Sequence, residues 1–360
     1  MFQYILKRLS IMIPTLLGIT LLTFFIMKLA PGDPVTLKLM FVGEGVSPQA
    51  LAEALASKED PLELPSWYKH FVDEVAGTGK TEEGKLEKTL NWIGKNTLFY
   101  GKWLKNILKL DFGLSSKDKR PVLSRILEAL PITLTLNILT ILIIYFISIP
   151  LGVWSALKDG TVWDKAMMVY LFLLYSLPSF WVATMLLVYF AGGEYFNWFP
   201  LRGYVSDGAE ILPWWQWLAN VAWHLVLPIT AYVVGSFAFL ARFSKTNFLE
   251  VIRQDYVRTA RAKGLGESRV LWKHAFRNSM IPLVTLMGGL LPALLGGSVI
   301  IEQIFSIPGM GMLSFEAVLS RDYNLIMGIE AISAILTLFG LLLSDLFYVV
   351  VDPRISFEGK

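Results

Sequence analysis

Residues 129–157, ALPITLTLNILTILIIYFISIPLGVWSAL, form a stretch of 29 residues without one Asp, Glu, Lys or Arg. A helix needs about 20 apolar residues to cross a hydrocarbon core of roughly 30 Å, so this stretch is long enough to span a membrane. The whole chain has the same character, because 54% of its 360 residues are hydrophobic and only 17% are charged. The sequence therefore predicts an all-α, polytopic membrane protein.

Four further charge-free stretches predict spanning helices, at residues 9–27, 166–193, 211–241 and 278–301. A sixth stretch, 325–351, is just as apolar but contains Glu330 and Asp345, which lie near its ends, where a carboxylate is less costly than at the bilayer centre. The first stretch follows Lys7 and Arg8 as a signal peptide would, but its apolar run is longer than a usual signal core. We expect a retained helix and six transmembrane helices in all.

The basic residues predict the orientation of these helices. The N-terminus, the loop around Lys158 and Lys165, residues 242–277 and the C-terminal tail together contain fifteen Lys and Arg, whereas the opposite short loops contain only Arg202 and Arg321. Basic residues in short loops favour the cytoplasmic side. We therefore expect a multi-pass membrane protein with both termini in the cytoplasm.

The chain divides into three predicted regions: a leading helix at 1–30, an external loop and insert at 31–128, and a five-helix core at 129–360. The insert is water-soluble in composition between residues 38 and 109, and we expect it to be mainly helical. Helix starts are predicted at Ser47, which precedes a proline, and at Thr81, which precedes two glutamates. The insert is interpreted either as a cap over the outer mouth or as a specific docking site.

The helical spacing of three insert residues, Leu86, Leu90 and Ile93, predicts a packing stripe, with Trp92, Trp103 and Leu104 available beside it. Residues 77–81, GTGKT, resemble the end of a phosphate-binding loop, but the glycine that the full motif requires five residues before Gly79 is Glu74 here. We do not expect a nucleotide site there.

Residues 242–280 form the largest predicted cytoplasmic surface. An i, i+4 stripe runs along it, and its side chains shrink from Phe248 through Ile252, Tyr256 and Ala260 to Gly264. Such a taper favours insertion into a cleft, and Gly264 is placed to end the helix in a left-handed conformation.

A second helix in this segment should carry Arg269, Lys273 and Arg277 on one face, a row that suits anionic headgroups. The alternative interpretation of the whole segment is an amphipathic helix that lies in the membrane interface.

Several motifs are spread over most of the chain, and they are DYVRTARAKGL at 255–265, HAFRNSMIPLVT at 274–285, IPTLLGITLLTFF and APGDP within 13–34, DFGLS at 111–115, LPITLTL at 130–136, LPSFWVA at 177–183, GGSVIIEQIFSIPGMG at 296–311, RDYNLIMG at 321–328 and VDPRI at 351–355. Together they resemble the oligopeptide and dipeptide permeases of bacterial ABC importers, which are proteins of the prokaryotic plasma membrane. The importer coupling motif is often written Glu-Ala-Ala, three residues, then Gly. Here Arg258 replaces its acidic residue, as is usual in the peptide-type branch.

This resemblance implies a type I importer permease, which is not itself an enzyme. It implies a homologous second permease subunit, two cytoplasmic ATPases and an external solute-binding protein as partners. It also implies that ATP and magnesium bind to the ATPases and that no cofactor binds to this chain. The coupling residues implied by the resemblance are Asp255, Tyr256, Arg258, Thr259, Ala260, Arg261 and Gly264.

A few uncharged polar residues within the spans are candidates to line a translocation pathway. They are Asn137, Ser176, Thr230, Ser236, Thr285 and Ser298. For each of them, a hydrogen bond between helices is the alternative role. The glycines around Pro292 should allow the fifth span to bend or to pack closely.

Other functions find less support in the sequence. An intramembrane enzyme is one alternative. The chain has no cysteine, and its three histidines, His70, His224 and His274, fall in an external loop, a span and a cytoplasmic loop, so they are not expected to bind one metal ion together. An ion-coupled secondary transporter should show carboxylates near the bilayer midplane, and a net charge of +3 does not indicate nucleic-acid binding. We expect di- or oligopeptides as solutes, with oligosaccharides or metal chelates as alternatives.

Overall fold

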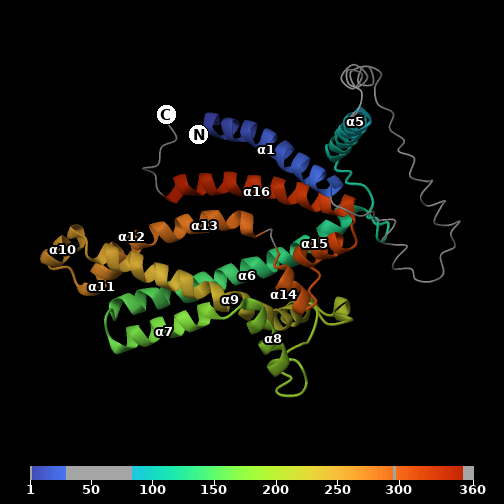
Figure 1. The fold of residues 1–360 in the computed structure, drawn as a ribbon. Helices are drawn as coiled ribbons and strands as arrows, with labels where there is room; N and C mark the ends of the chain where they lie inside the picture. Colours follow the sequence, from blue (N-terminus) through green and yellow to red (C-terminus); the bar gives the residue numbers. More distant parts are fainter. Residues whose placement is uncertain (1, 30–82, 295–296, 352–360) are drawn as a thin grey trace. The chain divides into compact units, whose positions relative to one another are not determined.

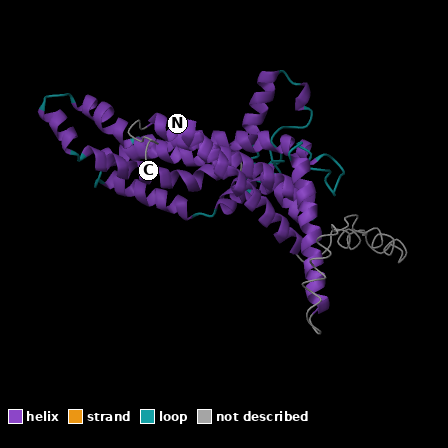
Figure 2. Cartoon of the chain, turned by 90° about the horizontal axis from the view of Figure 1, so that it is seen from above, coloured by secondary structure: helices purple, strands orange, loops and turns teal. Residues whose placement is uncertain are grey.

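The computed structural model describes residues 2–29, 83–294 and 297–351. These residues form helices joined by loops, and no strand occurs among them, which confirms the all-α prediction (Figure 2). The predicted helix start at Ser47 and the GTGKT motif lie outside the described residues. The helices in chain order are α1 (Phe2–Leu29), α5 (Glu83–Ile107), α6 (Val122–Leu157), α7 (Val162–Ser176), α8 (Ser179–Phe190), the 3₁₀ turn η1 (Ala209–Ile211), α9 (Trp214–Ile252), α10 (Asp255–Ala262), α11 (Glu267–Arg269), the π-helix η2 (Val270–Phe276), α12 (Arg277–Ser279), α13 (Ile281–Ala293), α14 (Val299–Ile304), α15 (Met310–Leu319) and α16 (Tyr323–Val351) (Figure 1).

The contacts divide the chain into two compact units. Unit 1 contains residues 1–13, 126–316 and 332–360, and unit 2 contains residues 14–125 and 317–331. Four helices of the described residues are long and apolar enough to cross a membrane, and a fifth crossing is possible if α7 and α8 form one span. The four are α1, α6, α9 and α16, which agree with the first, second, fourth and sixth predicted spans.

The third predicted span is not one helix, because α7 and α8 meet at a bend of 91°. Leu177 at the bend has an extended backbone, with φ −80° and ψ 127°. The residue after it, Pro178, lacks the N–H that would continue the helix and disfavours a helical conformation in the residue before it. The prediction of a single helix over 166–193 was therefore wrong.

The fifth predicted span is also divided, since α13 contains 13 residues and α14 contains 6. Ser298, which caps α14, is extended at φ −93° and ψ 105°. Neither helix alone has the length of a transmembrane crossing. The count of six crossings stays a prediction.

Within unit 1, α9 packs against α7 and α8, and it crosses α6 at very short range. A Cβ added to Gly152 of α6 would lie 2.4 Å from the carbonyl oxygen of Ala241 and 2.7 Å from Cβ of Ser244. One turn earlier on α6, the Ser148 hydroxyl donates a hydrogen bond of 3.0 Å to the carbonyl of Phe237. Small residues allow two helix backbones to approach in this way, and interhelical hydrogen bonds hold them together.

The beginning of α1 and the end of α16 also meet within unit 1. Asp345 accepts a hydrogen bond of 2.8 Å from the Tyr4 hydroxyl and lies 2.9 Å from Nη2 of Arg8. Arg8 in turn donates from Nε to the Tyr4 oxygen at 2.8 Å. These two partners explain how the apolar sixth stretch accommodates a carboxylate.

Glu302 of α14 is a fully buried carboxylate within unit 1. It accepts hydrogen bonds from the Thr133 hydroxyl at 3.1 Å and from the backbone N–H of Met312 at 2.8 Å. A Cβ on Gly297 would come within 2.3 Å of its Oε1, and one on Gly309 within 2.6 Å of its Oε2. The glycines of the GGSVIIEQIFSIPGMG motif therefore leave room for a buried carboxylate and its hydrogen-bond donors.

In unit 2, α5 packs on α1 through aromatic side chains. Phe24 stacks on Phe99 with ring centroids 6.0 Å apart, and the Thr20 and Tyr100 hydroxyls lie 2.8 Å apart. A helix follows the predicted start as α5, although Thr81 itself lies outside the described residues. Of the predicted stripe, Leu90 is half-buried and Ile93 is exposed, whereas the predicted Trp103 is buried together with Tyr100.

A second buried carboxylate, Asp322, organises the rest of unit 2. It accepts hydrogen bonds from the Ser115 hydroxyl at 2.5 Å and from the N–H of Ser116 at 2.8 Å. It also accepts from the N–H of Leu325 at 3.2 Å and so caps the start of α16. The DFGLS and RDYNLIMG motifs are thus joined by one carboxylate.

Candidate functional site

The segment after α9 does not form the continuous helix that the tapered stripe requires. Gln254 has φ −70° and ψ 150°, an extended conformation that separates α9 from α10. Phe248 is buried with Val153 and Ala275, whereas Ala260 is buried in a different cluster. The prediction of one continuous tapered stripe was therefore wrong, because its members face different surroundings within the chain, and insertion of α10 into a cleft stays a prediction.

Helix α10 folds back on the π-helix η2 through a small apolar cluster. Val257 and Ala260 of α10 pack with Val270 of η2, and Ile252 and Leu265 cover them. The cluster keeps α10 in a defined position although α10 has only 8 residues. Because a helix of that length is marginal alone, this packing is what stabilises it.

The π-helix explains how the second half of the segment packs. Val270 and Ala275 are both fully buried, and their separation of five residues matches the π repeat. The predicted basic row, Arg269, Lys273 and Arg277, is exposed. This part of the segment therefore has one apolar side against the protein and one cationic side that is free to meet another surface.

Gly264 ends α10 in the predicted left-handed conformation, with φ +75°. Its N–H donates to the carbonyl of Arg261 at 2.9 Å. An added Cβ would meet nothing within 4 Å, so within this chain the backbone angle alone requires glycine.

Five of the seven predicted coupling residues lie on the exposed side of α10, and they are Asp255, Tyr256, Arg258, Thr259 and Arg261. Ala260 is buried, and Gly264 follows the helix. The Tyr256 hydroxyl accepts a hydrogen bond of 2.9 Å from the Asn278 amide. Arg261 pairs with Glu267 at 2.6 Å, and its hydrogen bonds lower the pKa of the Glu267 carboxyl below its usual value.

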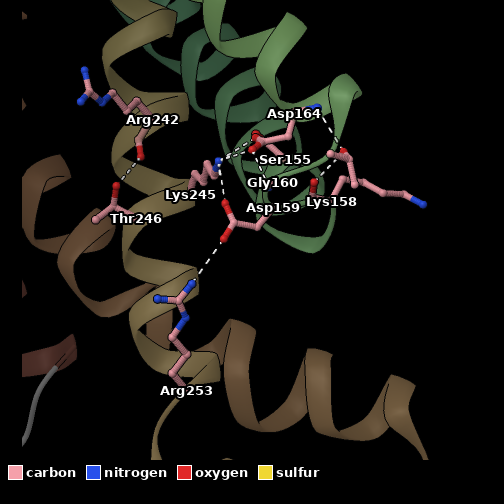
Figure 3. Close-up of polar contacts among 10 residues, drawn as sticks. Ser155, Lys158, Asp159, Gly160, Asp164, Arg242, Lys245, Thr246 and Arg253 are labelled. Carbon is pink, nitrogen blue, oxygen red and sulfur yellow. Dashed lines mark hydrogen bonds and ion pairs between the residues drawn. The ribbon is translucent and has the colours of Figure 1, made fainter.

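A buried charge cluster connects the end of α9 to the loop between α6 and α7 (Figure 3). Nζ of Lys245 lies 2.6 Å from Asp164 and 3.1 Å from Asp159. Asp164 also accepts from the Ser155 hydroxyl at 2.5 Å and from the N–H of Gly160 at 3.1 Å. The side chains of Lys245 and Asp164 are only 12% and 5% exposed, so the pair is a largely buried, hydrogen-bonded ion pair.

Two further contacts complete this cluster. Arg253, the residue after α9, lies 3.3 Å from Asp159, and the Thr161 hydroxyl caps α7 by accepting from the N–H of Asp164 at 3.3 Å. Sequence reasoning used this loop only for its positive charges and missed its carboxylates. The available signal was Thr161 followed three residues later by Asp164, the pattern of a helix-capping box.

Two of the predicted pathway residues make hydrogen bonds between segments. The Asn137 amide donates to the carbonyl of Leu294 at 2.8 Å. The Ser298 N–H donates to the Tyr232 hydroxyl at 3.0 Å, and its own hydroxyl accepts from Ile301 to cap α14. The Asn137 side chain therefore joins two segments, as the alternative interpretation expects, whereas the Ser298 hydroxyl caps its own helix and its backbone makes the bond to Tyr232.

The other pathway candidates lie on α7, α9 and α13. The hydroxyls of Ser176, Thr230 and Thr285 each donate to the carbonyl four residues earlier in their own helix. Ser236 is exposed on α9. Thr230 lines a cavity of about 410 Å³ between α6 and α9, whose other walls are apolar. A role of these residues in translocation stays a prediction.

Comparison with known proteins identifies relatives over the whole chain. The model of a family described as binding-protein-dependent transport system inner membrane component matches residues 148–357. The inner membrane ABC transporter permease protein YejB of Escherichia coli O157:H7 is 39% identical over the full length of both chains. The oligopeptide transport system permease protein AppB of Bacillus subtilis is 36% identical over 99% of this chain and 100% of its own. The dipeptide transport system permease protein DppB of Escherichia coli K12 is 34% identical over 99% of each.

Among solved structures, the chain is similar to an inward-facing conformation of the MetNI methionine ABC transporter. The match has a TM-score of 0.49 and 16% sequence identity, and it covers 63% of this chain and 96% of the other.

Replacement of Gly264 by alanine should loosen the end of α10. An alanine in the left-handed region costs about 1 kcal/mol or more, so local opening should become about fivefold more frequent. Hydrogen–deuterium exchange of the amides in residues 255–265, followed by mass spectrometry, measures this change. The matched control is Gly266→Ala, because Gly266 has φ −58° and open space around it. Equal exchange in the two variants would contradict the account.

Replacement of Lys245 by methionine should destabilise the protein strongly. The change leaves Asp164 buried without its cation, which typically costs about 3–5 kcal/mol. Thermal unfolding of the purified protein in detergent should show a clear fall in Tm. The control Arg253→Gln removes a cation that is 68% exposed and should cost less than about 1 kcal/mol. Adding Asp164→Leu to Lys245→Met should recover much of the loss, whereas a single variant no worse than the control would refute the importance of this pair.

Proposed function

The chain belongs to the family of binding-protein-dependent transport system inner membrane components, and on that premise we propose that it forms half of the membrane pathway of an ATP-driven importer of di- and oligopeptides. The observation that carries the proposal is the full-length similarity to permeases whose names specify dipeptide and oligopeptide transport. The other half is a homologous permease subunit. A solute-binding protein delivers the peptide from outside, and two cytoplasmic ATPases bind ATP and magnesium.

The proposed orientation has both termini in the cytoplasm. The distribution of basic residues supports it. The contacts of Tyr4 and Arg8 with Asp345 also support it, because they bring the beginning of α1 and the end of α16 to one end of unit 1. Two chain ends on one side require an even number of crossings. Six crossings result if α7 with α8, and α13 with α14, each cross once.

The proposed coupling element is α10 together with the turn at Gly264. Its outer side presents Asp255, Arg258 and Arg261, which are polar and exposed, rather than the small side chains of the predicted taper. The apolar cluster under α10 and the Lys245 cluster beyond it hold this surface on the end of α9. A displacement that an ATPase imposes on α10 would therefore reach α9 and the α6–α7 loop together.

Peptides suit the spans better than charged solutes do. A peptide pathway must accept many side chains, which favours neutral, weakly polar walls. The one observation that favours oligosaccharides is a group of exposed tryptophans around the outer ends of α8 and α9, including Trp198, Trp214 and Trp215. Exposed indole rings at this level are also typical of membrane-interface anchoring.

The proposal is tested by uptake into vesicles that hold the complete complex. Labelled peptides and labelled oligosaccharides of three to six units are compared, with ATP and with a non-hydrolysable ATP analogue. We expect uptake of peptides with ATP and no uptake with the analogue. ATP-dependent uptake of oligosaccharides without peptide uptake would overturn the solute class, and no ATP-dependent uptake of either would overturn the proposal of a peptide importer.

A further inference from the structure

A cavity of about 590 Å³ opens between α7 and α9, within unit 1. Met168, Leu171 and Phe172 of α7 form one wall. On α9, Phe239 and Arg242 line the opposite wall. The rings of Phe172 and Phe239 are 67% and 57% exposed, so the cavity is open to the surroundings of the protein.

The walls of this cavity change from apolar to cationic along α9. Ala238 and Phe239 lie at one end, and Arg242, Lys245 and Thr246 lie at the other. The distance along the helix from residue 238 to residue 246 is about 12 Å, at 1.5 Å per residue. The cationic end is the one next to the α6–α7 loop, which is cytoplasmic in the proposed orientation. A ligand that matches these walls has a charged end at the cytoplasmic surface and an apolar part that points toward the bilayer centre.

The charge available to such a ligand comes from Arg242. Lys245 is already neutralised by Asp164 and Asp159. The Arg242 side chain points away from that cluster (Figure 3), and no carboxylate among the residues that the structure describes forms an ion pair with it. The cavity therefore has one uncompensated positive charge beside apolar walls.

We propose that this cavity binds an anionic phospholipid of the cytoplasmic leaflet, with its phosphate on Arg242 and the upper part of an acyl chain between Phe172 and Phe239. Basic pockets between membrane helices on the cytoplasmic side favour anionic headgroups. A transported peptide fits less well, because its amide groups would lie unpaired against phenylalanine, leucine and methionine side chains. The proposal goes beyond the transport function and uses only its orientation.

The first test is native mass spectrometry of the complete complex, purified in detergent and titrated with phosphatidylglycerol or phosphatidylcholine of identical chains. We expect tighter binding of phosphatidylglycerol, and about fivefold weaker binding of it to Arg242→Gln, the effect of one cation near an anionic surface. The control Lys263→Gln removes an exposed cytoplasmic cation outside this cavity and should leave the binding unchanged. Equal binding of the two lipids, or equal losses in the two variants, would overturn the proposal.

The second test identifies what occupies the cavity in a membrane. A photo-reactive benzoylphenylalanine replaces Phe239 in the complex, which is reconstituted with phosphatidylglycerol and illuminated. A phosphatidylglycerol adduct supports the proposal, whereas an adduct with the second permease subunit or with a transported peptide overturns it. Peptide uptake is measured on the same vesicles, so a failure of the lipid proposal is distinguished from a failure of the transport function.

Discussion

The ion pair between Lys245 and Asp164 is the interaction on which the end of unit 1 around α10 depends. Two largely buried charges at 2.6 Å are stable only when their remaining hydrogen-bonding capacity is also used. Ser155 and the N–H of Gly160 complete the shell of Asp164, and Asp159 supplies the second carboxylate for Lys245. The cluster therefore holds together the end of α6, the start of α7 and the last turns of α9.

Buried carboxylates with several donors recur at other junctions of the chain. Glu302 and Asp322 are both fully buried, and each accepts hydrogen bonds from backbone N–H groups as well as from a hydroxyl. The glycines around Glu302 are necessary because a Cβ on Gly297 or Gly309 would collide with its carboxylate. The motifs that make the family recognisable thus also have a structural role in joining segments within each unit.

The sequence predicted what depends on local pattern and missed what depends on distant partners. Long apolar runs predicted α1, α6, α9 and α16, and the left-handed glycine at 264 followed from its place after a helix. The bend at Pro178 is local in origin, yet the apolar composition on both sides concealed it. The prediction of one tapered stripe was wrong because the extended backbone of Gln254 separates α9 from α10, so the residues of α10 do not continue the face of α9. The partner of Asp345 was unpredictable from pattern, since Tyr4 lies 341 residues away in the chain.

The central claim is that α10 and the α6–α7 loop move as one body, because the apolar cluster under α10 holds α10 on α9, and the Lys245 cluster and the α6–α9 crossing at Gly152 join α9 to that loop. Because this chain has no native cysteine, the variant Lys158→Cys/Thr259→Cys carries spin labels at these two of its positions only. Their distance distribution, measured by double electron–electron resonance in the complete complex, tests the claim most directly. The account predicts the same distribution without nucleotide and with ATP bound, and a broader one after Lys245→Met. A shift in the mean distance between the two nucleotide states would contradict it.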